Sequence, residues 1–251
     1  MAKLFITGNI HSMQCILDSK TGEKVSVQFL IDCEVTEMKE AMIKVENVKK
    51  TFGDEMVLKG ISCEFVKGKT HAVVGNNGSG KSVFFKCICG FIEPTEGKIL
   101  VGGKEIGKDV DFTESLGLII ERPGFLPGLS GFKNLRLLAN IRGLISDEQI
   151  KDTIVRVGLD PASKKGVGKY SMGMKQRLGI AQAIMENPEV LILDEPFNGL
   201  DKDGVQEIRE LIMELKASGK TIFLTSHNNE DIKVLADVVW EMDGGRLARC
   251  N

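Results

Sequence analysis

Alternation of apolar and polar residues predicts strands near the start of the chain. Val25, Val27, Phe29 and Ile31 occupy every second position, as residues do in a strand with one buried face. Residues 15–17, upstream of a turn-like polar segment, could form the partner strand of a hairpin. No cluster of polar side chains interrupts this pattern, so we expect packing rather than chemistry from it.

A second set of strands follows after a break in the pattern. Residues 34–40 are polar and acidic, which is typical of a linker or a short helix. Alternation resumes at residues 43–48, and residues 57–66 form another strand-rich segment. We therefore expect an N-terminal extension at residues 1–41, with a hairpin as its candidate structure, and a separate domain at residues 42–251.

Uninterrupted apolar runs predict strands that are buried on both faces of a sheet. The runs of this kind are residues 70–74, 116–120 and 190–193. Residues 220–227 are predicted to form a further strand, which ends in His227. Turn residues predict two further hairpins, one from residues 98–101 and 102–106, and one around Asp243-Gly244.

Apolar residues at helical spacing predict a helical subdomain between these strands, at about residues 122–180. Ser146 has the character of a helix-capping residue, with Gln149 three positions later. The apolar positions of this region are Leu135, Leu138, Ala139, Ile150, Ile154 and Val157. A later helix has Val205, Ile208, Leu211, Ile212 and Leu215 on one face.

The composition excludes several classes of protein. The chain has 251 residues, of which 42% are hydrophobic and 27% charged, as in an ordinary globular domain. A formal net charge of −2 gives no general attraction to nucleic acid, and we expect no nucleic-acid partner. No apolar run approaches the roughly 18 residues that a membrane span needs. The six cysteines form no C-x-x-C pair and are expected to be reduced thiols rather than zinc ligands.

The segment most informative about function is a glycine-rich loop at residues 75–82. It fits the phosphate-binding pattern G-x-x-x-x-G-K-[ST], between a predicted buried strand and a predicted helix. Glycines let several backbone N–H groups point at one centre, and the helix N-terminus adds partial positive charge there. The alternative, a chance glycine-rich turn, does not explain this context. The candidate phosphate-binding residues are Gly75, Asn76, Asn77, Gly78, Ser79, Gly80, Lys81 and Ser82.

Two acidic residues, Asp194 and Glu195, follow the apolar run at residues 190–193. Open α/β sheets place ligand chemistry at the carboxyl ends of their strands. Asp194 could hold Mg²⁺ together with the Ser82 hydroxyl, and Lys81 could reach the terminal phosphates of a nucleotide. Glu195 could polarise a water molecule. Without the phosphate loop, a solvated turn would be the better interpretation of this acidic pair.

The sequence Tyr170-Ser171-Met172-Gly173-Met174-Lys175-Gln176-Arg177 resembles the L-S-G-G-Q signature of ATP-binding cassette (ABC) proteins and the helix that follows it. The resemblance covers residues 42–251, with the phosphate loop, the signature, Asp194-Glu195, an Asn198-Gly199-Leu200-Asp201 segment and His227 in the family's order. It implies a P-loop NTPase core, namely a mixed sheet with helices on both faces, plus an antiparallel β subdomain and an inserted helical subdomain.

The resemblance also implies the activity and the partners. Such cassettes bind and hydrolyse ATP with Mg²⁺, and two of them pack head to tail so that each signature contacts the ATP of the other. A homodimer, or a heterodimer with a similar chain, is therefore expected. Transmembrane permease subunits would be separate chains, which would hold this one at the cytoplasmic face of the membrane.

The resemblance also implies roles for individual residues of this chain that match the family's motifs. Ser171 and Gly173 match the signature residues that contact the γ-phosphate, whereas Met172 and Met174 depart from the pattern. His227 resembles the switch histidine at the γ-phosphate. Phe52 lies where the family has an aromatic residue that stacks on adenine, with a plain core phenylalanine as the alternative.

Among the positions that differ from the family pattern, Glu121 is the most informative about the subgroup. The family usually has glutamine here, at the joint between the core and the helical subdomain, where it senses Mg²⁺ and the membrane partner. Glutamate at this joint and the flanking residues 119–130 are similar to cassettes of bacitracin-resistance and lantibiotic-immunity exporters. We therefore expect an ATPase subunit that powers transport, in the export direction and against antimicrobial peptides. The alternatives are a non-transport ABC ATPase acting on a soluble assembly, and a binding module without ATPase chemistry.

Overall fold

The computed structural model describes residues 10–17, 24–31, 40–113, 115–121 and 124–250. The chain forms two compact units, residues 1–39 and 40–251. In the first unit, β1 (Ile10–Leu17) pairs antiparallel with β2 (Lys24–Ile31) in a hairpin. The second unit begins two residues before the predicted boundary, because the Glu40 carbonyl accepts a hydrogen bond from the Lys67 amide.

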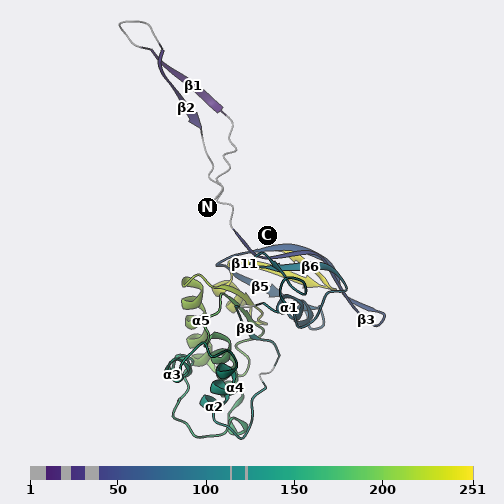
Figure 1. Ribbon diagram of the computed structural model, residues 1–251, viewed down its shortest axis with the longest axis vertical. Coiled ribbons are helices and arrows are strands. Elements are labelled where there is room, and N and C mark those ends of the chain that lie inside the picture. The colour runs from purple at the N-terminus through teal and green to yellow at the C-terminus, as the bar shows by residue number, and fades with distance from the viewer. Residues whose placement is uncertain (1–9, 18–23, 32–39, 114, 122–123, 251) are drawn as a thin grey trace. The chain divides into compact units, whose positions relative to one another are not determined.

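A six-stranded mixed sheet in the order β12-β11-β5-β10-β9-β8 forms the centre of the second unit (Figure 1). Only β12 is antiparallel to its neighbour, and the other pairs are parallel. This arrangement confirms the predicted α/β class. The strands are β5 (Thr70–Val74), β8 (Leu116–Ile119), β9 (Val190–Leu193), β10 (Thr221–Leu224), β11 (Val238–Asp243) and β12 (Arg246–Arg249).

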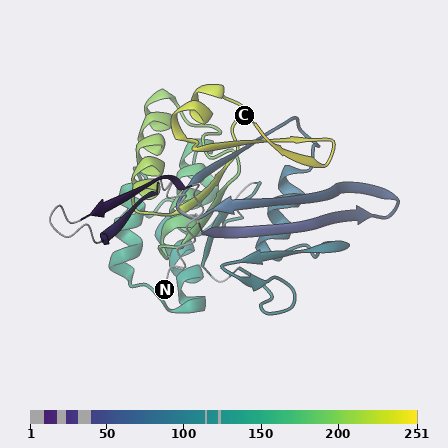
Figure 2. The same ribbon diagram turned by 90° about the horizontal axis from the view of Figure 1, so that it is seen from above.

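An antiparallel sheet in the order β4-β3-β6-β7 packs beside the mixed sheet. Its long hairpin meets the turn between β11 and β12, where the Lys59 amide donates to the Gly245 carbonyl over 2.8 Å. Figure 2 shows this blue hairpin extending past the helices, with the yellow β11–β12 hairpin alongside. The strands are β3 (Ala41–Phe52), β4 (Glu55–Val66), β6 (Glu96–Val101) and β7 (Lys104–Glu105).

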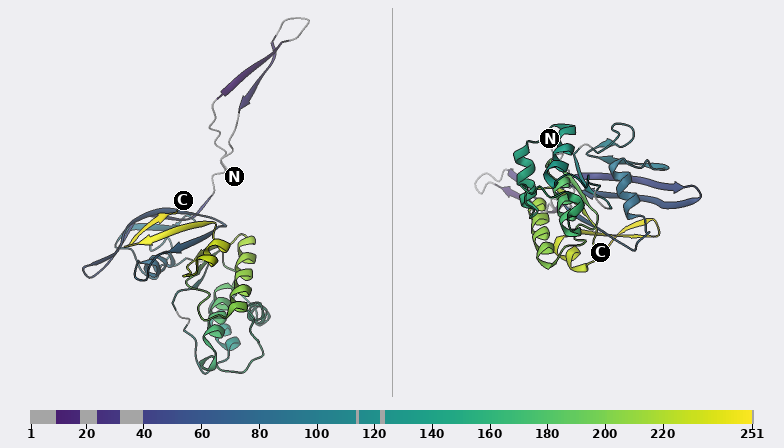
Figure 3. Two further views of the ribbon diagram at one scale, coloured as in Figure 1. Left: turned by 180° about the vertical axis from the view of Figure 1, so that it is seen from behind. Right: turned by 90° about the horizontal axis from the view of Figure 1, so that it is seen from below.

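The helices fall into two groups. Three belong to the core: α1 (Lys81–Cys89), α5 (Lys202–Ala217) and α6 (Asn229–Leu235). The others are α2 (Gly131–Arg142), α3 (Asp147–Arg156), the 3-10 turn η1 (Val167–Lys169) and α4 (Met172–Ile184). Figures 1 and 3 show α2, α3 and α4 gathered at the end of the unit away from the antiparallel sheet. No helix of the described segments is long and apolar enough to cross a bilayer.

Alternate residues of the central strands are buried on opposite faces of the mixed sheet. Leu191 and Leu193 belong to a core shared with the helices α2 to α5, whereas Val190 and Ile192 join a second core beneath α1 and the antiparallel sheet. Both sets are fully or almost fully buried. Burial on both faces is why these strands are apolar without alternation.

Sequence patterns predicted the position of the capped helix α3 more accurately than the position of the last hairpin turn. Ser146 and Gln149 form the predicted capping box at the start of α3. The last hairpin turns at Gly244-Gly245 rather than at the predicted Asp243-Gly244, because both glycines have positive φ and Asp243 still pairs with Arg246. The short helix α6 was not predicted, since seven residues are too few for a clear helical pattern.

His71 is a buried ionisable residue within an aromatic cluster. Trp240 Nε1 lies 3.4 Å from His71 Nδ1, and the indole can only donate, so Nδ1 accepts. Nε2 therefore carries the proton and donates to the Val66 carbonyl over 3.0 Å. Phe223 stacks on the ring at 5.5 Å between centroids, and Phe65 meets it edge-on at 5.2 Å. Burial lowers the pKa of His71 below its ordinary value.

We expect this histidine to make the fold sensitive to mild acid. The unfolded chain binds a proton near the ordinary histidine pKa of about 6.5, while the folded chain resists it. The contribution of neutral His71 is complete above that pH and is lost as pH falls below it. Each unit of pKa depression corresponds to about 1.4 kcal/mol. Melting temperatures measured from pH 7.5 to 5 should fall less steeply for His71→Gln than for the parent, and equal slopes would contradict this assignment.

Candidate functional site

The predicted phosphate loop lies between β5 and α1, at the carboxyl edge of the mixed sheet. Gly75 has a φ of 147°, and a Cβ atom there would collide with the Met242 carbonyl of the neighbouring strand β11. Gly80, with a φ of 110°, lets the chain turn directly into α1. These glycines hold the loop against the sheet edge and leave the N-terminus of α1 at its centre, as an anion site requires.

Lys81 folds back over this loop. Its Nζ donates to the Gly75 carbonyl over 2.6 Å and to the Asn76 carbonyl over 3.0 Å. The ammonium group thus lies within the loop, where it can neutralise bound phosphate oxygens. No other residue between positions 75 and 82 carries a positive charge.

Ser82, Asp194 and Thr225 meet at the same edge. Ser82 Oγ donates to Asp194 Oδ2 over 3.2 Å, and Thr225 Oγ1 donates to Asp194 Oδ1 over 2.7 Å. A hydroxyl and a carboxylate oxygen are ligands that suit Mg²⁺. The described residues include no cluster of three or more His, Cys, Asp or Glu that could hold a metal. This donor set fits a Mg²⁺ that takes its remaining ligands from phosphates and water.

Glu195 has an unusual backbone conformation beside this site. Its φ is 52°, in the left-handed region that residues with a Cβ rarely adopt. Two hydrogen bonds hold it: its amide donates to Thr225 Oγ1 over 2.8 Å, and its carbonyl accepts from Gln176 Nε2 over 3.1 Å. Backbone strain of this kind is concentrated at functional sites.

The Glu195 side chain faces His227. His227 Nε2 lies 3.5 Å from Glu195 Oε1, and the imidazole is largely exposed at the end of β10. Burial raises the pKa of the Glu195 carboxyl, and nearby His227 and Lys81 oppose that rise. A raised pKa makes a carboxylate a better proton acceptor. The structure therefore brings Lys81, Ser82, Asp194, Glu195 and His227 together at one sheet edge.

The signature residues lie on the helical group instead. Ser171 caps α4, with its Oγ accepting from the Met174 amide over 3.1 Å. Tyr170 is buried, and its hydroxyl accepts from the Gly131 amide over 3.3 Å, which explains how a tyrosine fits here. Gly173 approaches the Gly199 carbonyl so closely that a Cβ would not fit. In the part of the chain that the structure describes, no hydrogen bond or ion pair joins Ser171 or Gly173 to the phosphate loop.

Phe52 and Glu121 lie at the margins of the site. Phe52 is 46% exposed, and Lys50 Nζ lies 5.0 Å from its ring centroid, so the core alternative is excluded. Glu121 has a φ of 63°, and its Oε1 accepts from Lys86 Nζ over 2.7 Å. The described contacts of Glu121 include none with Ser82 or Asp194, and its metal role stays a prediction.

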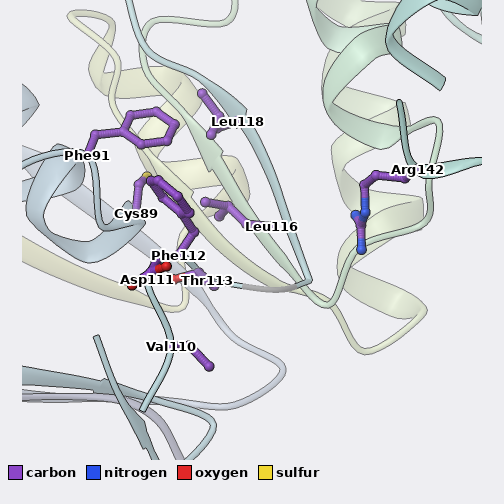
Figure 4. A pocket seen from close by; sticks show the side chains of 9 residues that line it. All are labelled: Cys89, Phe91, Val110, Asp111, Phe112, Thr113, Leu116, Leu118 and Arg142. Carbon is purple, nitrogen blue, oxygen red and sulfur yellow. The ribbon is translucent and has the colours of Figure 1, made fainter. Parts of the chain in front are cut away.

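A cavity of about 570 Å³ opens between the core and the helical group. Figure 4 shows Phe91 and Phe112 on one side and Arg142 of α2 on the other. The two phenylalanine rings meet edge-on at 6.1 Å and are 53% and 56% exposed. Leu116 and Leu118 of β8 form part of its wall. Exposed aromatic side chains beside a cavity are typical of a protein interaction site.

Sequence reasoning missed two residues of the site, Thr225 and Gln176. Neither residue has a proposed role in the reaction itself. Thr225 forms hydrogen bonds with Asp194 and Glu195, and Gln176 forms one with Glu195. Thr225 had a weak signal, since it ends a buried strand next to His227. Gln176 had none, because its contact depends on how α4 packs against the sheet.

Three comparisons with known proteins agree. Residues 58–198 match the family model described as ABC transporter. The bacitracin transport ATP-binding protein BcrA of Enterococcus faecalis is 41% identical over 83% of this chain and 68% of its own length. The lantibiotic transport ATP-binding protein SrtF of Streptococcus pyogenes is 38% identical over 82% and 89%. The structure of cbiO1 from Clostridium perfringens, part of a transporter complex, superposes with a TM-score of 0.70 at 30% identity, covering 83% and 87%.

Proposed function

The chain belongs to the ABC transporter family as an ATP-binding ATPase subunit, and we propose that it powers export of antimicrobial peptides through separate membrane subunits. One observation supports the ATPase activity within this proposal. The phosphate-loop lysine Lys81, the hydrogen-bonded pair Ser82 and Asp194, and the pair Glu195 and His227 lie together at one edge of the sheet. The names of the relatives, which transport bacitracin and lantibiotics, support the cargo class and the similarity to that subgroup. Nothing among the described residues favours a non-transport alternative.

Each residue has a proposed role in hydrolysis. The N–H groups of residues 75–82 and the Lys81 ammonium bind the β- and γ-phosphates. Ser82 and Asp194 would hold Mg²⁺, which would neutralise phosphate charge. Glu195 accepts a proton from the attacking water. His227 contacts both that carboxylate and the γ-phosphate and so positions them relative to each other. Phe52 stacks on adenine.

The site is completed by a second cassette. Among the described residues, no hydrogen bond or ion pair joins Ser171 or Gly173 to the phosphate loop of their own chain. The N-terminus of α4 is exposed and is suited to bind phosphate. We place this helix end on the ATP of a partner cassette, in a homodimer or a heterodimer. Residues 42–251 form the cassette, with its helical subdomain at about 122–180.

The membrane subunits would dock in the cavity lined by Phe91 and Phe112. A loop of the membrane protein that inserts an apolar side chain there would touch both the core and α2. The chain would then lie at the cytoplasmic face of the membrane, held by its partners. Movement of the helical group after ATP binding would be transmitted through this contact.

We expect Phe112→Ala to uncouple the ATPase from its membrane partner. Because the ring is already half exposed, its removal should leave folding and basal turnover within about twofold. Stimulation of turnover by the membrane subunit should fall by about tenfold or more. The assay compares ATPase rates with and without that subunit in proteoliposomes.

Val155→Ala is the matched control, since Val155 is a similarly exposed apolar residue on α3, outside the cavity lining. It should keep full stimulation. Full stimulation of Phe112→Ala would contradict the docking site, and absence of stimulation in the parent by any candidate membrane subunit would contradict the transport function itself.

Glu121→Gln should affect coupling more than hydrolysis. Glutamate and glutamine have the same size, and each has an oxygen that can face a metal shell, so they differ mainly in charge. ATP affinity should stay within about tenfold, which corresponds to about 1.4 kcal/mol. The measurement is ATPase rate against Mg²⁺ concentration, with and without membrane subunits. If variant and parent match in both respects, Glu121 is a bystander held by Lys86.

A further inference from the structure

A buried ion pair joins the helix α5 to the short helix α6. Asp231 in the first turn of α6 is only 2% exposed. Its Oδ1 accepts from Arg209 Nε over 2.8 Å and from Arg209 Nη2 over 2.6 Å. The Arg209 side chain, on α5, is itself mostly buried, and its Nη1 lies 3.5 Å from Glu230. None of these residues belongs to the site already described.

The other carboxylate oxygen of Asp231 contacts the segment of residues 225–227, which we call the switch segment because it contains His227. Ser226 Oγ donates to Asp231 Oδ2 over 2.6 Å and accepts from the Asn228 amide over 3.0 Å. Ser226 stands between Thr225, which binds Asp194 and Glu195, and His227, which faces Glu195. The side chains of three successive residues, 225 to 227, therefore make three different contacts.

Stability alone does not explain this arrangement. A buried ion pair gives little net stability compared with apolar side chains of similar volume, and in some proteins its role is to specify the conformation of the groups that it contacts. Here the ion pair contacts Ser226, the residue before His227. The His227 side chain is exposed, and among the described residues its one ion pair is with Glu195.

We propose that Arg209 and Asp231 are positioning residues, which act through Ser226 to hold His227 in its catalytic orientation. The proposal rests on the proposed ATPase function. Because α5 starts at its capping residue Asp201, directly after Gly199 and Leu200, the pair also connects that segment to the switch histidine of the same cassette. A displacement of His227 by about 1 Å would slow turnover without removing any phosphate ligand of the loop.

Ser226→Ala tests the connection, because it removes the hydroxyl and leaves the Arg209–Asp231 pair in place. We expect kcat to fall about tenfold or more, with the KM for ATP and the affinity for a fluorescent ATP analogue within about twofold. Ser226→Thr, which keeps a hydroxyl, should restore most of the lost turnover. Melting curves must show that each variant folds.

A double-mutant cycle tests whether Asp231 acts through Ser226. Asp231→Asn should lower kcat alone, and combination with Ser226→Ala should add little to it. Arg156→Gln is the control, because it breaks an exposed ion pair with Glu214 of α5 that does not touch the switch segment. It should leave kcat unchanged.

Parent-like turnover in Ser226→Ala, additive losses in the double variant, or an equal loss of kcat and ATP affinity would each overturn the proposal. Its failure is distinguishable from failure of the proposed function. In the latter case, the parent itself would hydrolyse no ATP, or Glu195→Gln would hydrolyse it at the parent rate.

Discussion

Glutamine in place of Glu195 should lower kcat by about a hundredfold or more and leave ATP bound. The carboxylate is the only acidic group that faces His227 among the described ion pairs, and a neutral amide cannot accept the proton of the attacking water. Glutamine has the same shape, and the bonds from Thr225 and Gln176 involve only the backbone of residue 195. The strained conformation at φ 52° should therefore persist.

A trapped nucleotide should also hold two cassettes together. Gel filtration of the Glu195→Gln variant with MgATP should give a dimer, while the same protein without nucleotide should elute as a monomer. A variant that binds ATP and still elutes as a monomer at high concentration would contradict the head-to-tail arrangement. An obligate heterodimer must be excluded by a parallel run with a candidate partner cassette, so that it is not mistaken for a monomer.

Alanine in place of Lys81 should abolish ATP binding or turnover without unfolding the domain. Lys81 supplies the only positive side chain of the loop, and its Nζ already lies at the carbonyls of Gly75 and Asn76. Loss of one such donor typically costs a factor of about 10² to 10³ in catalysis. Because the backbone of the loop is fixed by its glycines and by the sheet, the fold should survive.

Equilibrium binding of a fluorescent ATP analogue, together with the ATPase rate and a melting curve, tests this expectation. Lys98→Ala is a suitable control, since Lys98 forms an exposed ion pair with Glu46 in the antiparallel sheet. Near-normal turnover in a folded Lys81→Ala protein would exclude the assignment of the phosphate loop.

The sequence by itself determined the parts of this protein whose cause is local. Apolar periodicity reports which face of a strand or helix is buried, so the strands of the mixed sheet and the capped helix α3 were predicted close to their observed bounds. The phosphate loop was predictable because its glycine spacing, lysine and serine act within eight consecutive residues. The position of Asp194 followed from the rule that parallel strands carry chemistry at their carboxyl ends, whereas the role of His227 was expected only from the resemblance to ABC cassettes.

Only the tertiary structure decided the features that depend on contacts between distant elements. The left-handed backbone of Glu195 requires Thr225 and Gln176, which lie 30 and 19 positions away in the chain. The exposure of Phe52 and the pairing of Glu121 with Lys86 were equally invisible, because a residue type does not specify its neighbours. Such contacts arise when strands and helices pack, and the sequence of a single element contains no signal for them.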